Sequence, residues 1–351
     1  MDAPLWTDAH APSLSDLPQS EVRDRLGRTV DEPMNLVLQG PPGVGKTAAV
    51  RALAREAHDD PDNDLVEINV ADFFSRTKKQ IRTDPRFEQF LTGRSRMAKR
   101  DMISRVLKES AGYAPVSGDY KTILLDNAEH IREDFQQALR RVMERHHRTT
   151  QFVITTRQPT KLIPPIRSRC FPVPVRAPST EETTAVLRDV AEAEGVECEA
   201  MALDIVASKA NGDLREAILA AQSAAVEGDG EITTASAQAA LSDVGHDEEL
   251  KDVLETARDG DLTDARKTLT TLLDDEGFDG QDLLGDLLRV ADTYPEEFGE
   301  RDVVRLHRLA GSVDLDLAEG LDARLHLTHL LSAWATGQRE LDEEPSGERV
   351  V

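Results

Sequence analysis

Short apolar runs alternate with longer helical stretches over the first half of the chain. Five runs of five or six residues, rich in branched apolar side chains, are predicted to form β-strands: 35–39, 65–70, 122–126, 151–156 and 171–175. The segments between them show helical patterns, and this order is typical of a parallel sheet covered by helices. We therefore expect an α/β core with a parallel five-stranded sheet.

After residue 178 the pattern becomes helical. Ser179 and Glu182 form a capping-box sequence, which predicts a helix that begins there and ends near residue 194. Three further helices are predicted at 201–211, 213–227 and 233–241. Helical periodicity then continues from 246 to about 338, with these predicted breaks: Gly260, 277–280, Pro295 and Gly311.

These patterns divide the chain into an α/β domain, two all-α domains and a flexible tail, with the boundaries 1–178, 179–245, 246–340 and 341–351. The length agrees with this division, because 351 residues accommodate two or three domains. The tail is polar and charged, and we expect it to be frayed.

The chain is strongly acidic. It carries 66 Asp and Glu against 42 Lys and Arg, which gives a net charge of −24, and only 4% of its residues are aromatic. The regular apolar periodicity argues against disorder, so the acidity resembles the carboxylate-rich surfaces of halophilic archaeal proteins. A negative net charge normally argues against nucleic-acid binding, but a local basic segment can still bind phosphate.

Two cysteines, Cys170 and Cys198, are too few for a disulfide framework or a metal site of their own. The sequence shows no signal peptide and no apolar run of about eighteen residues. We expect a cytoplasmic protein that has no membrane partner.

The strongest chemical signal is a phosphate-binding loop (P-loop), which follows a predicted strand and precedes a predicted helix, as its mechanism requires. Its residues are Gly40, Pro41, Pro42, Gly43, Val44, Gly45, Lys46 and Thr47. The glycines let backbone N–H groups turn towards phosphates at a helix N-terminus. Lys46 is expected to reach the β- and γ-phosphates, and the Thr47 hydroxyl is expected to bind Mg²⁺. The alternative is a glycine-rich turn that binds nothing.

Asp126 ends the third predicted strand, where a nucleotide enzyme places a carboxylate that holds Mg²⁺. The alternative is an ordinary helix cap, since Asp126 and Asn127 both suit that role. In such enzymes a glutamate normally follows the aspartate, and here Asn127 takes its place. The sequence therefore predicts binding of ATP with Mg²⁺ beside an altered hydrolytic centre.

A basic segment stands out between residues 76 and 108. It holds eleven Arg and Lys against three acidic residues, in a chain whose overall charge is negative. Clustered cations are typical of nucleic-acid contact, although a solvated helix face is the alternative. The candidate DNA-binding residues within it are Arg94, Arg96, Lys99 and Arg100.

Five sequence strings together resemble one family: GPPGVGKT (40–47), LLDNAEH (124–130), QQALRRVME (136–144), IRSRC (166–170) and GDLREAI (212–218). They are similar to the small subunit of replication factor C, the sliding-clamp loader of archaea and eukaryotes and an AAA+ protein. The resemblance implies an AAA+ core, an all-α lid and an all-α collar that oligomerises. It also implies a hetero-pentamer with other clamp-loader subunits, a sliding clamp and primer–template DNA as partners.

The resemblance assigns roles to four arginines. Arg169, in the Ser-Arg-Cys string, would be an arginine finger that acts in trans on the ATP of a neighbouring subunit. Arg215 would be the lid arginine that senses the γ-phosphate, while Arg140 and Arg141 match a helix that links DNA and interface contacts to the ATP site. For each of them the alternative is a surface salt bridge.

Three departures from the family pattern fall on the chain's own ATP site. Asn127 replaces the catalytic glutamate, and an amide cannot accept a proton from water. Arg157 replaces the asparagine of the sensor position, where a cation could instead pair with phosphate. The string at 6–12 lacks the basic and tyrosyl residues that help to hold adenine.

We therefore expect a diverged paralogue that binds ATP, hydrolyses it weakly and supplies Arg169 to a neighbour. Three alternatives remain. One is a fully active ATPase subunit, in which Glu129 or a neighbour positions the attacking water. The others are a different AAA+ DNA-processing ATPase and a non-catalytic assembly scaffold.

Overall fold

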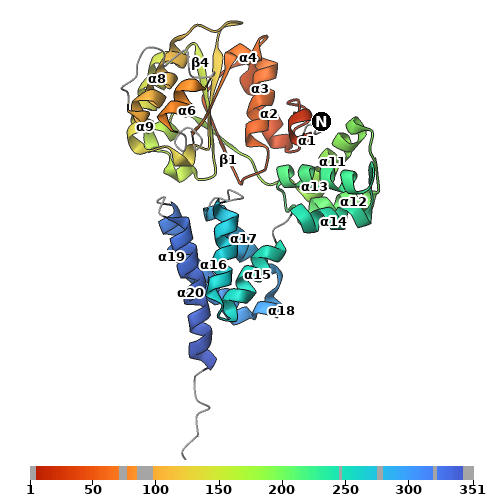
Figure 1. Cartoon of the computed structure of the whole chain (residues 1–351). Coiled ribbons are helices and arrows are strands. Elements are labelled where there is room, and N and C mark those ends of the chain that lie inside the picture. Colours follow the sequence, from red (N-terminus) through yellow and green to blue (C-terminus); the bar gives the residue numbers. More distant parts are fainter. Residues whose placement is uncertain are drawn as a thin grey trace, which may run out of the picture. The chain divides into compact units, whose positions relative to one another are not determined.

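The computed structural model describes residues 5–70, 77–84, 98–244, 247–274, 280–318 and 322–342 (Figure 1). The chain divides into two compact units, residues 1–241 and residues 242–351. Both cysteines are free thiols, and no described helix has both the length and the apolar character needed to cross a membrane.

A parallel five-stranded sheet forms the centre of the first unit, as predicted. Its strands are β1 (Leu36–Gln39), β2 (Leu65–Asn69), β3 (Lys121–Asp126), β4 (Thr150–Thr156) and β5 (Phe171–Pro174). Their spatial order is β2-β3-β4-β1-β5, and every neighbouring pair is parallel. The predicted strand ends lie within one residue of the observed ends.

Helices cover both faces of this sheet because successive strand side chains point to opposite sides. On β1, Leu36 and Leu38 are buried in one apolar cluster, and Val37 is buried in another. The first cluster includes residues of α2 (Ser20–Asp31) and α3 (Lys46–Ala57), and the second includes residues of α8 (Lys99–Gly112) and α9 (Glu133–His146). Figure 1 shows these two helix pairs on opposite sides of the strands.

Shorter elements complete this α/β part: α1 (Trp6–Ala9), α4 (Pro61–Asp64), α6 (Lys78–Thr83), η1 (Ala128–His130), η2 (Pro159–Lys161) and α10 (Pro164–Arg167). Trp6 is buried against the helices that follow the sheet, and its backbone N–H donates to the Gln222 side chain at 2.9 Å. The N-terminal segment is thereby fixed to the lid.

The lid follows as a group of helices: α11 (Thr180–Glu194), α12 (Ala200–Lys209), α13 (Leu214–Glu227) and α14 (Thr234–Val244). The capping box of Ser179 and Glu182 is formed as predicted. The lid is helical as predicted, and it also contains a short parallel pair that the sequence did not predict, β6 (Glu197–Cys198) with β7 (Glu231–Ile232). This pairing joins the segments that enter α12 and α14 and buries Ile232 completely.

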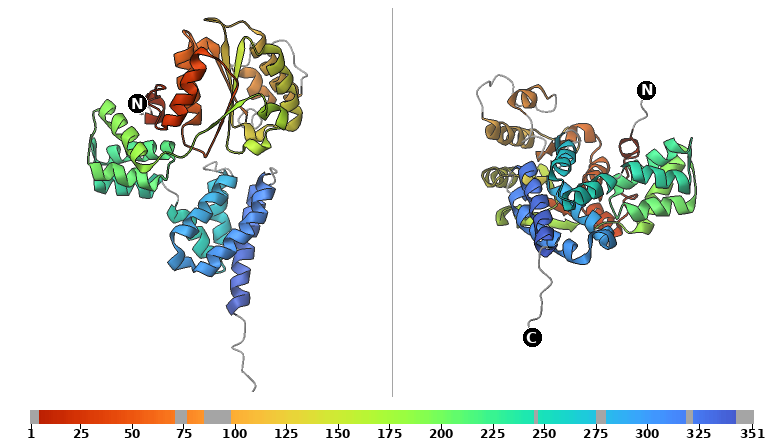
Figure 2. Two further views of the ribbon diagram at one scale, coloured as in Figure 1. Left: turned by 180° about the vertical axis from the view of Figure 1, so that it is seen from behind. Right: turned by 60° about the horizontal axis from the view of Figure 1, so that its bottom comes forward.

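The second unit is helical, with α15 (Asp247–Arg258), α16 (Leu262–Asp274), α17 (Gly280–Thr293), α18 (Pro295–Phe298), α19 (Glu300–Ala318) and α20 (Ala323–Asp342) (Figure 2). Its core includes Trp334, whose indole N–H donates to the Asp302 carbonyl at 3.0 Å. The predicted break at Gly311 is wrong. The helix continues because Ala310 and Val313 are buried beside it, which outweighs the roughly 1 kcal/mol cost of a helical glycine.

The predicted tail also begins too early. Helix α20 ends at Asp342, so residues 341 and 342 are helical. The remaining residues of the predicted tail, 343–351, lie outside the described residues.

A buried lysine gives the first unit a testable pH dependence. Lys121 begins β3, is only 3% exposed, and donates to the Tyr113 carbonyl. Burial lowers its pKa to about 8. The protonated Lys121 side chain therefore lowers the free energy of unfolding below pH 8. This cost disappears as the pH rises from 8 towards the ordinary lysine value, because the folded state loses the proton first.

We expect Lys121→Met to raise the free energy of unfolding by about 1–2 kcal/mol at pH 7. The advantage should shrink between pH 8 and 10, which denaturant unfolding at several pH values measures. The exposed Lys78 changed to Met is the control and should show no such trend. Parallel pH profiles for the parent and Lys121→Met would contradict the expectation.

Candidate functional site

The phosphate loop connects β1 to α3 and depends on glycine at defined positions. Gly43 and Gly45 have φ angles of 66° and 92°, in the left-handed region that favours glycine. A Cβ atom at Gly43 would also lie 2.0 Å from the carboxylate of Asp213. Both observations show that the backbone of the loop can be approached closely because these positions have no side chain.

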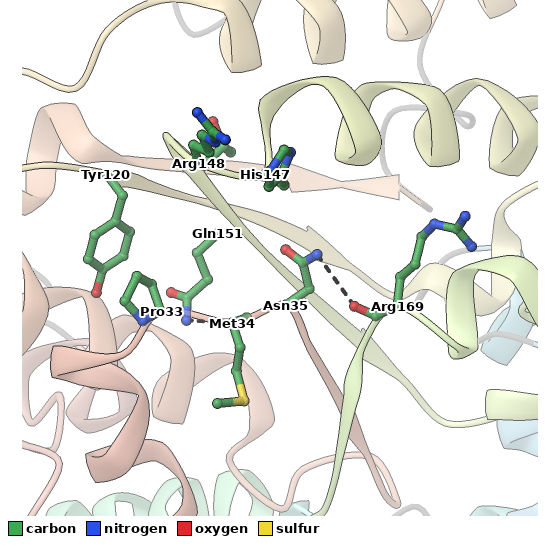
Figure 3. A pocket seen from close by; sticks show the side chains of 9 residues that line it. Pro33, Met34, Asn35, Tyr120, His147, Arg148, Gln151 and Arg169 are labelled. Carbon is green, nitrogen blue, oxygen red and sulfur yellow. Dashed lines mark hydrogen bonds between the residues drawn. The ribbon is translucent and has the colours of Figure 1, made fainter.

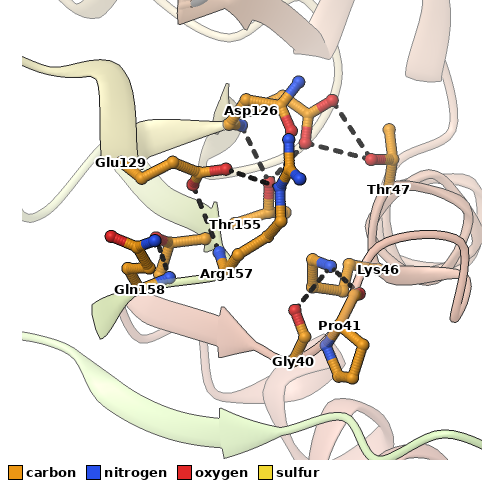
Figure 4. A network of polar contacts seen from close by, with 11 residues as sticks. Gly40, Pro41, Lys46, Thr47, Asp126, Glu129, Thr155, Arg157 and Gln158 are labelled. Atoms are coloured by element: carbon orange, nitrogen blue, oxygen red, sulfur yellow. Dashed lines mark hydrogen bonds and ion pairs between the residues drawn. The ribbon is translucent and has the colours of Figure 1, made fainter. Parts of the chain in front are cut away.

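Lys46 is the first residue of α3 and is 8% exposed. Its ammonium donates to the carbonyl oxygens of Gly40, at 2.9 Å, and Pro41 (Figure 4). Burial lowers the pKa of Lys46, while the negative charge of Glu129 opposes that change. A phosphate group placed on the loop would supply the anion that this desolvated cation favours.

Thr47 and Asp126 meet across the site. The Thr47 hydroxyl lies 3.0 Å from Oδ1 and 3.1 Å from Oδ2 of Asp126, at the carboxyl end of β3. Hydroxyl and carboxylate oxygens are the ligands that Mg²⁺ prefers, and it usually takes few of them from the protein. These two side chains therefore fit a magnesium ion that also contacts nucleotide phosphates.

Asn127 has left-handed backbone, with φ 55° and ψ 51°. Its N–H donates to the Thr155 hydroxyl at 3.2 Å, and that hydroxyl donates in turn to Asp126. Asparagine tolerates this conformation better than most residues, because its short side chain can form local hydrogen bonds. The local backbone therefore favours an asparagine at this position.

Glu129 and Arg157 form an ion pair inside the site. Oε1 of Glu129 accepts from Nε of Arg157 at 3.1 Å, and Oε2 accepts from the Arg157 backbone N–H at 3.2 Å (Figure 4). Glu129 is 8% exposed, and burial raises its pKa. Backbone N–H groups, the Thr156 hydroxyl and the Arg157 charge outweigh burial and hold the pKa below its usual range. The site thus contains an ionised carboxylate whose charge is already compensated.

The lid reaches the same loop through the start of α13. The backbone N–H of Leu214 donates to the Gly43 carbonyl at 3.1 Å, and Asp213 caps the helix by accepting from the Glu216 N–H at 2.9 Å. Arg215 follows directly and is exposed. Arg215 was predicted as a site residue from the sequence and Asp213 was not, although an aspartate at a predicted helix start is a recognisable cap signal.

Arg169 lies between α10 and β5, and its guanidinium contacts Glu144 of α9. Nη2 donates to Oε1 of Glu144 at 2.6 Å, and Nη1 donates to the Pro165 carbonyl at 2.8 Å. The same Glu144 oxygen lies 3.6 Å from Nε of Arg140. Glu144 was not identified from the sequence, because its partner is 25 residues away and nothing local signals the contact. Arg141, next to Arg140 on α9, is exposed.

A cavity of about 240 Å³ lies beside Arg169, at the amino ends of the strands. Figure 3 shows Arg169 with Asn35 and Gln151, and Asn35 donates to the Arg169 carbonyl at 3.4 Å. The phosphate loop follows the opposite, carboxyl end of β1. The four strand residues between these edges span roughly 13 Å. Arg169 is therefore remote from its own chain's loop.

The candidate DNA-binding residues are only partly within the described chain. Arg94 and Arg96 lie outside the described residues. Lys99 and Arg100 form the start of α8, where the structure describes their backbone.

Three family models match consecutive parts of the chain. The ATPase family associated with various cellular activities (AAA) matches residues 36–175, and the RCF1/5-like AAA+ ATPase lid domain matches residues 185–226. The replication factor C C-terminal domain matches residues 245–333.

Relatives named replication factor C small subunit match along almost the whole chain. That of Natronomonas pharaonis is 30% identical over 95% of this chain and 95% of its own length. That of Aeropyrum pernix is 31% identical over 95% of each chain. Among solved structures, the RuvB Holliday junction branch migration motor of Thermotoga maritima has a TM-score of 0.51 at 17% identity, covering 72% of this chain and 84% of its own. At that identity the likeness shows the fold alone.

The parallel sheet, the phosphate loop and the helical lid define an ATPase of the AAA+ class. The chain belongs to the replication factor C small subunit family, because these relatives match it nearly end to end. The resemblance found in the sequence is thereby confirmed, and membership of an ATPase family implies nucleotide binding.

A double-mutant cycle tests whether Glu129 and Arg157 act as a pair. Arg157→Gln leaves a buried carboxylate without its cation, so the single variant should be less stable than Arg157→Gln combined with Glu129→Gln. We expect a coupling of about 1–3 kcal/mol from denaturant unfolding. The exposed pair of Arg51 and Glu67, joined at 2.7 Å, is the control and should couple by less than about 1 kcal/mol. Additive effects at Glu129 and Arg157 would show that the pair is incidental.

Proposed function

We propose that this chain is a diverged small subunit of a clamp loader. It binds ATP with Mg²⁺, hydrolyses it weakly, and supplies Arg169 to the ATP site of a neighbouring subunit. The assembly is a hetero-pentamer that opens a sliding clamp for primer–template DNA. One contrast in the structure carries the proposal. In the chain's own ATP site the carboxylate of Glu129 is already paired with Arg157, whereas Arg169 is exposed at the other edge of the sheet.

The cis site is proposed to hold the triphosphate on the backbone of the phosphate loop. Lys46 turns from the carbonyl oxygens that it now contacts towards the β- and γ-phosphates. Thr47 and Asp126 supply oxygens to Mg²⁺, which neutralises phosphate charge when bound. Arg215 lies one residue beyond the lid contact with Gly43, and this position suits a group that senses the γ-phosphate.

Weak hydrolysis follows from the absence of a free base among the described residues around the loop. Asn127 cannot accept a proton from water, and such a loss typically costs about 10²–10⁴-fold. Glu129 is ionised, but Arg157 already neutralises it and solvent scarcely reaches it. One observation favours a second candidate, a fully active subunit. Because Glu129 stays ionised, it could orient water if the γ-phosphate drew Arg157 away.

DNA contact is proposed for the basic segment 76–108, through Arg94, Arg96, Lys99 and Arg100. Its local excess of cations in an acidic chain supports this role, since phosphate contacts depend on clustered Lys and Arg. Arg140 and Arg141 on α9 are proposed to link such contacts to the ATP site. Glu144, one turn beyond Arg140, lies close to both Arg140 and Arg169 and supports that link.

The first test concerns ATP binding itself. Lys46→Ala should weaken ATP affinity by about 1.5–3 kcal/mol, because it removes a charge-assisted contact to phosphate. Equilibrium titration with a fluorescent ATP analogue in the presence of Mg²⁺ measures this change. Lys78→Ala, at an exposed position of α6, is the control. Equal ATP affinity for Lys46→Ala and the parent would contradict the proposed binding of ATP at this site.

The second test distinguishes a subunit that supplies Arg169 to a neighbouring ATP site from a subunit that hydrolyses ATP at its own site. In the assembled complex, Arg169→Ala should lower ATP turnover at the adjacent site by roughly 10³–10⁵-fold, because it removes transition-state charge. Nucleotide binding to this chain should stay unchanged, and Lys46→Ala should reduce total turnover far less. Arg167→Ala, two residues away and exposed, is the matched control. A dominant effect of Lys46 with a silent Arg169 would instead establish the fully active subunit.

A further inference from the structure

Gln19 is a buried amide that joins two separate parts of the first unit. It is the N-cap residue of α2 and 2% exposed, but its side chain makes no capping bond to that helix. Instead its amide donates to the carbonyl oxygen of Val44 at 3.3 Å and to that of Arg176 at 3.0 Å. Val44 belongs to the phosphate loop. Arg176 belongs to residues 175–179, which connect β5 to α11 and which we call the lid linker. One amide thus binds the loop and the linker together.

The lid linker lies against the start of the phosphate loop. A Cβ atom at Gly40 would lie 1.9 Å from the Val175 carbonyl oxygen, so the two backbones meet where glycine is required. The Arg176 guanidinium then reaches Glu21 of α2 at 2.7 Å and Glu182 of α11 at 2.6 Å. The linker is therefore held by the loop, by α2 and by the first helix of the lid.

The lid linker also touches the turn that precedes α13. A Cβ atom at Gly212 would lie 2.7 Å from the Cβ atom of Ala177. Two residues further on, the Leu214 N–H donates to the Gly43 carbonyl of the phosphate loop at 3.1 Å. These contacts close a ring that runs from the loop through Gln19 and the linker to the lid, and from there back to the loop. Coupling between two parts of a protein is carried by continuous chains of contacts of this kind.

The bond to Val44 fixes the direction of one peptide group in the phosphate loop. A peptide group is planar and trans, so the N–H of Gly45 points away from the Val44 carbonyl. Because Gln19 holds that carbonyl on one side, the N–H is presented on the other side, and N–H groups of such loops bind phosphate. The bond is longer than the usual range of about 2.7–3.2 Å, so a small shift of the loop changes its strength.

We propose that Gln19 is a positioning residue that couples occupancy of the phosphate loop to the position of the lid. This inference rests on the proposed binding of ATP at the loop. Phosphate bound to the Gly45 N–H would polarise the same peptide group and thereby strengthen the bond from Gln19 to Val44. A stronger bond draws Gln19 and the lid linker towards the loop. The lid is then held where Leu214 contacts the loop.

The test uses the full-length chain with Gln19→Met, which keeps the side-chain length and removes both donors. Gln19→Asn is a milder second variant, because its amide is one methylene shorter and does not reach both carbonyls. If Gln19→Met fails to fold, Gln19→Asn decides alone. The matched control is Gln151→Met. Gln151 is also 2% exposed and donates to the Met34 carbonyl at 3.0 Å, but it lies at the amino edge of the sheet.

Hydrogen exchange followed by mass spectrometry is measured with and without ATP and Mg²⁺, at ATP concentrations that saturate each variant. In the parent, ATP should protect the amides of the phosphate loop and of the lid helices, residues 180–227. Both Gln19 variants should keep the protection of the loop and lose most of that of the lid. Their ATP affinity should fall about three- to tenfold, as expected for one lost hydrogen bond. Gln151→Met should keep both protections.

Lid protection that survives in the Gln19 variants would overturn the inference, as would its loss in Gln151→Met. A parent chain whose lid gains no protection when ATP is bound would also overturn it, while the proposed function stands. Joint loss of loop and lid protection in the saturated Gln19 variants would make Gln19 part of the phosphate site and contradict the coupling role. A parent chain that does not bind ATP would refute the proposed ATP binding, and this inference with it.

Discussion

The direction of the strands is the constraint on which the site depends. Because all five strands are parallel, their carboxyl ends lie at one edge of the sheet and their amino ends at the other. The phosphate loop and Arg157 follow carboxyl ends and Asp126 is the last residue of β3, whereas Arg169 precedes the amino end of β5. Residues that serve one nucleotide within a chain therefore gather at one edge. An arginine at the opposite edge is remote from that nucleotide.

The balance of positive and negative charge around the phosphate loop determines which ligands its side chains can bind. Lys46 and Arg157 bring two cations to a partly buried site, and Asp126 and Glu129 bring two carboxylates. Buried charges are tolerated only when they are paired, and a nucleotide with Mg²⁺ adds further charge of both signs. Binding of a nucleotide with Mg²⁺ would therefore require these charged side chains to exchange ion-pair partners. In the structure, Glu129 is paired with Arg157.

The strands and the phosphate loop were predictable because their signals are local: apolar runs, glycine positions and one capping box. The contacts of Arg157 were not. Its partner Glu129 is 28 residues away, and the two meet because β3 and β4 are neighbours with Leu125 opposite Ile154. The pairs of Glu144 with Arg169 and of β6 with β7 are similarly non-local. At Gly311, burial of the adjacent residues overrode the local helix-breaking preference.

The backbone of Asn127 limits which side chains fit at this position. A glutamate there would place a longer side chain in left-handed geometry, at a cost of roughly 1–2 kcal/mol. The N–H bond to Thr155 holds that geometry, and the added carboxylate would lie two residues from the ionised Glu129. A carboxylate introduced at this single position therefore carries a conformational cost that the amide avoids.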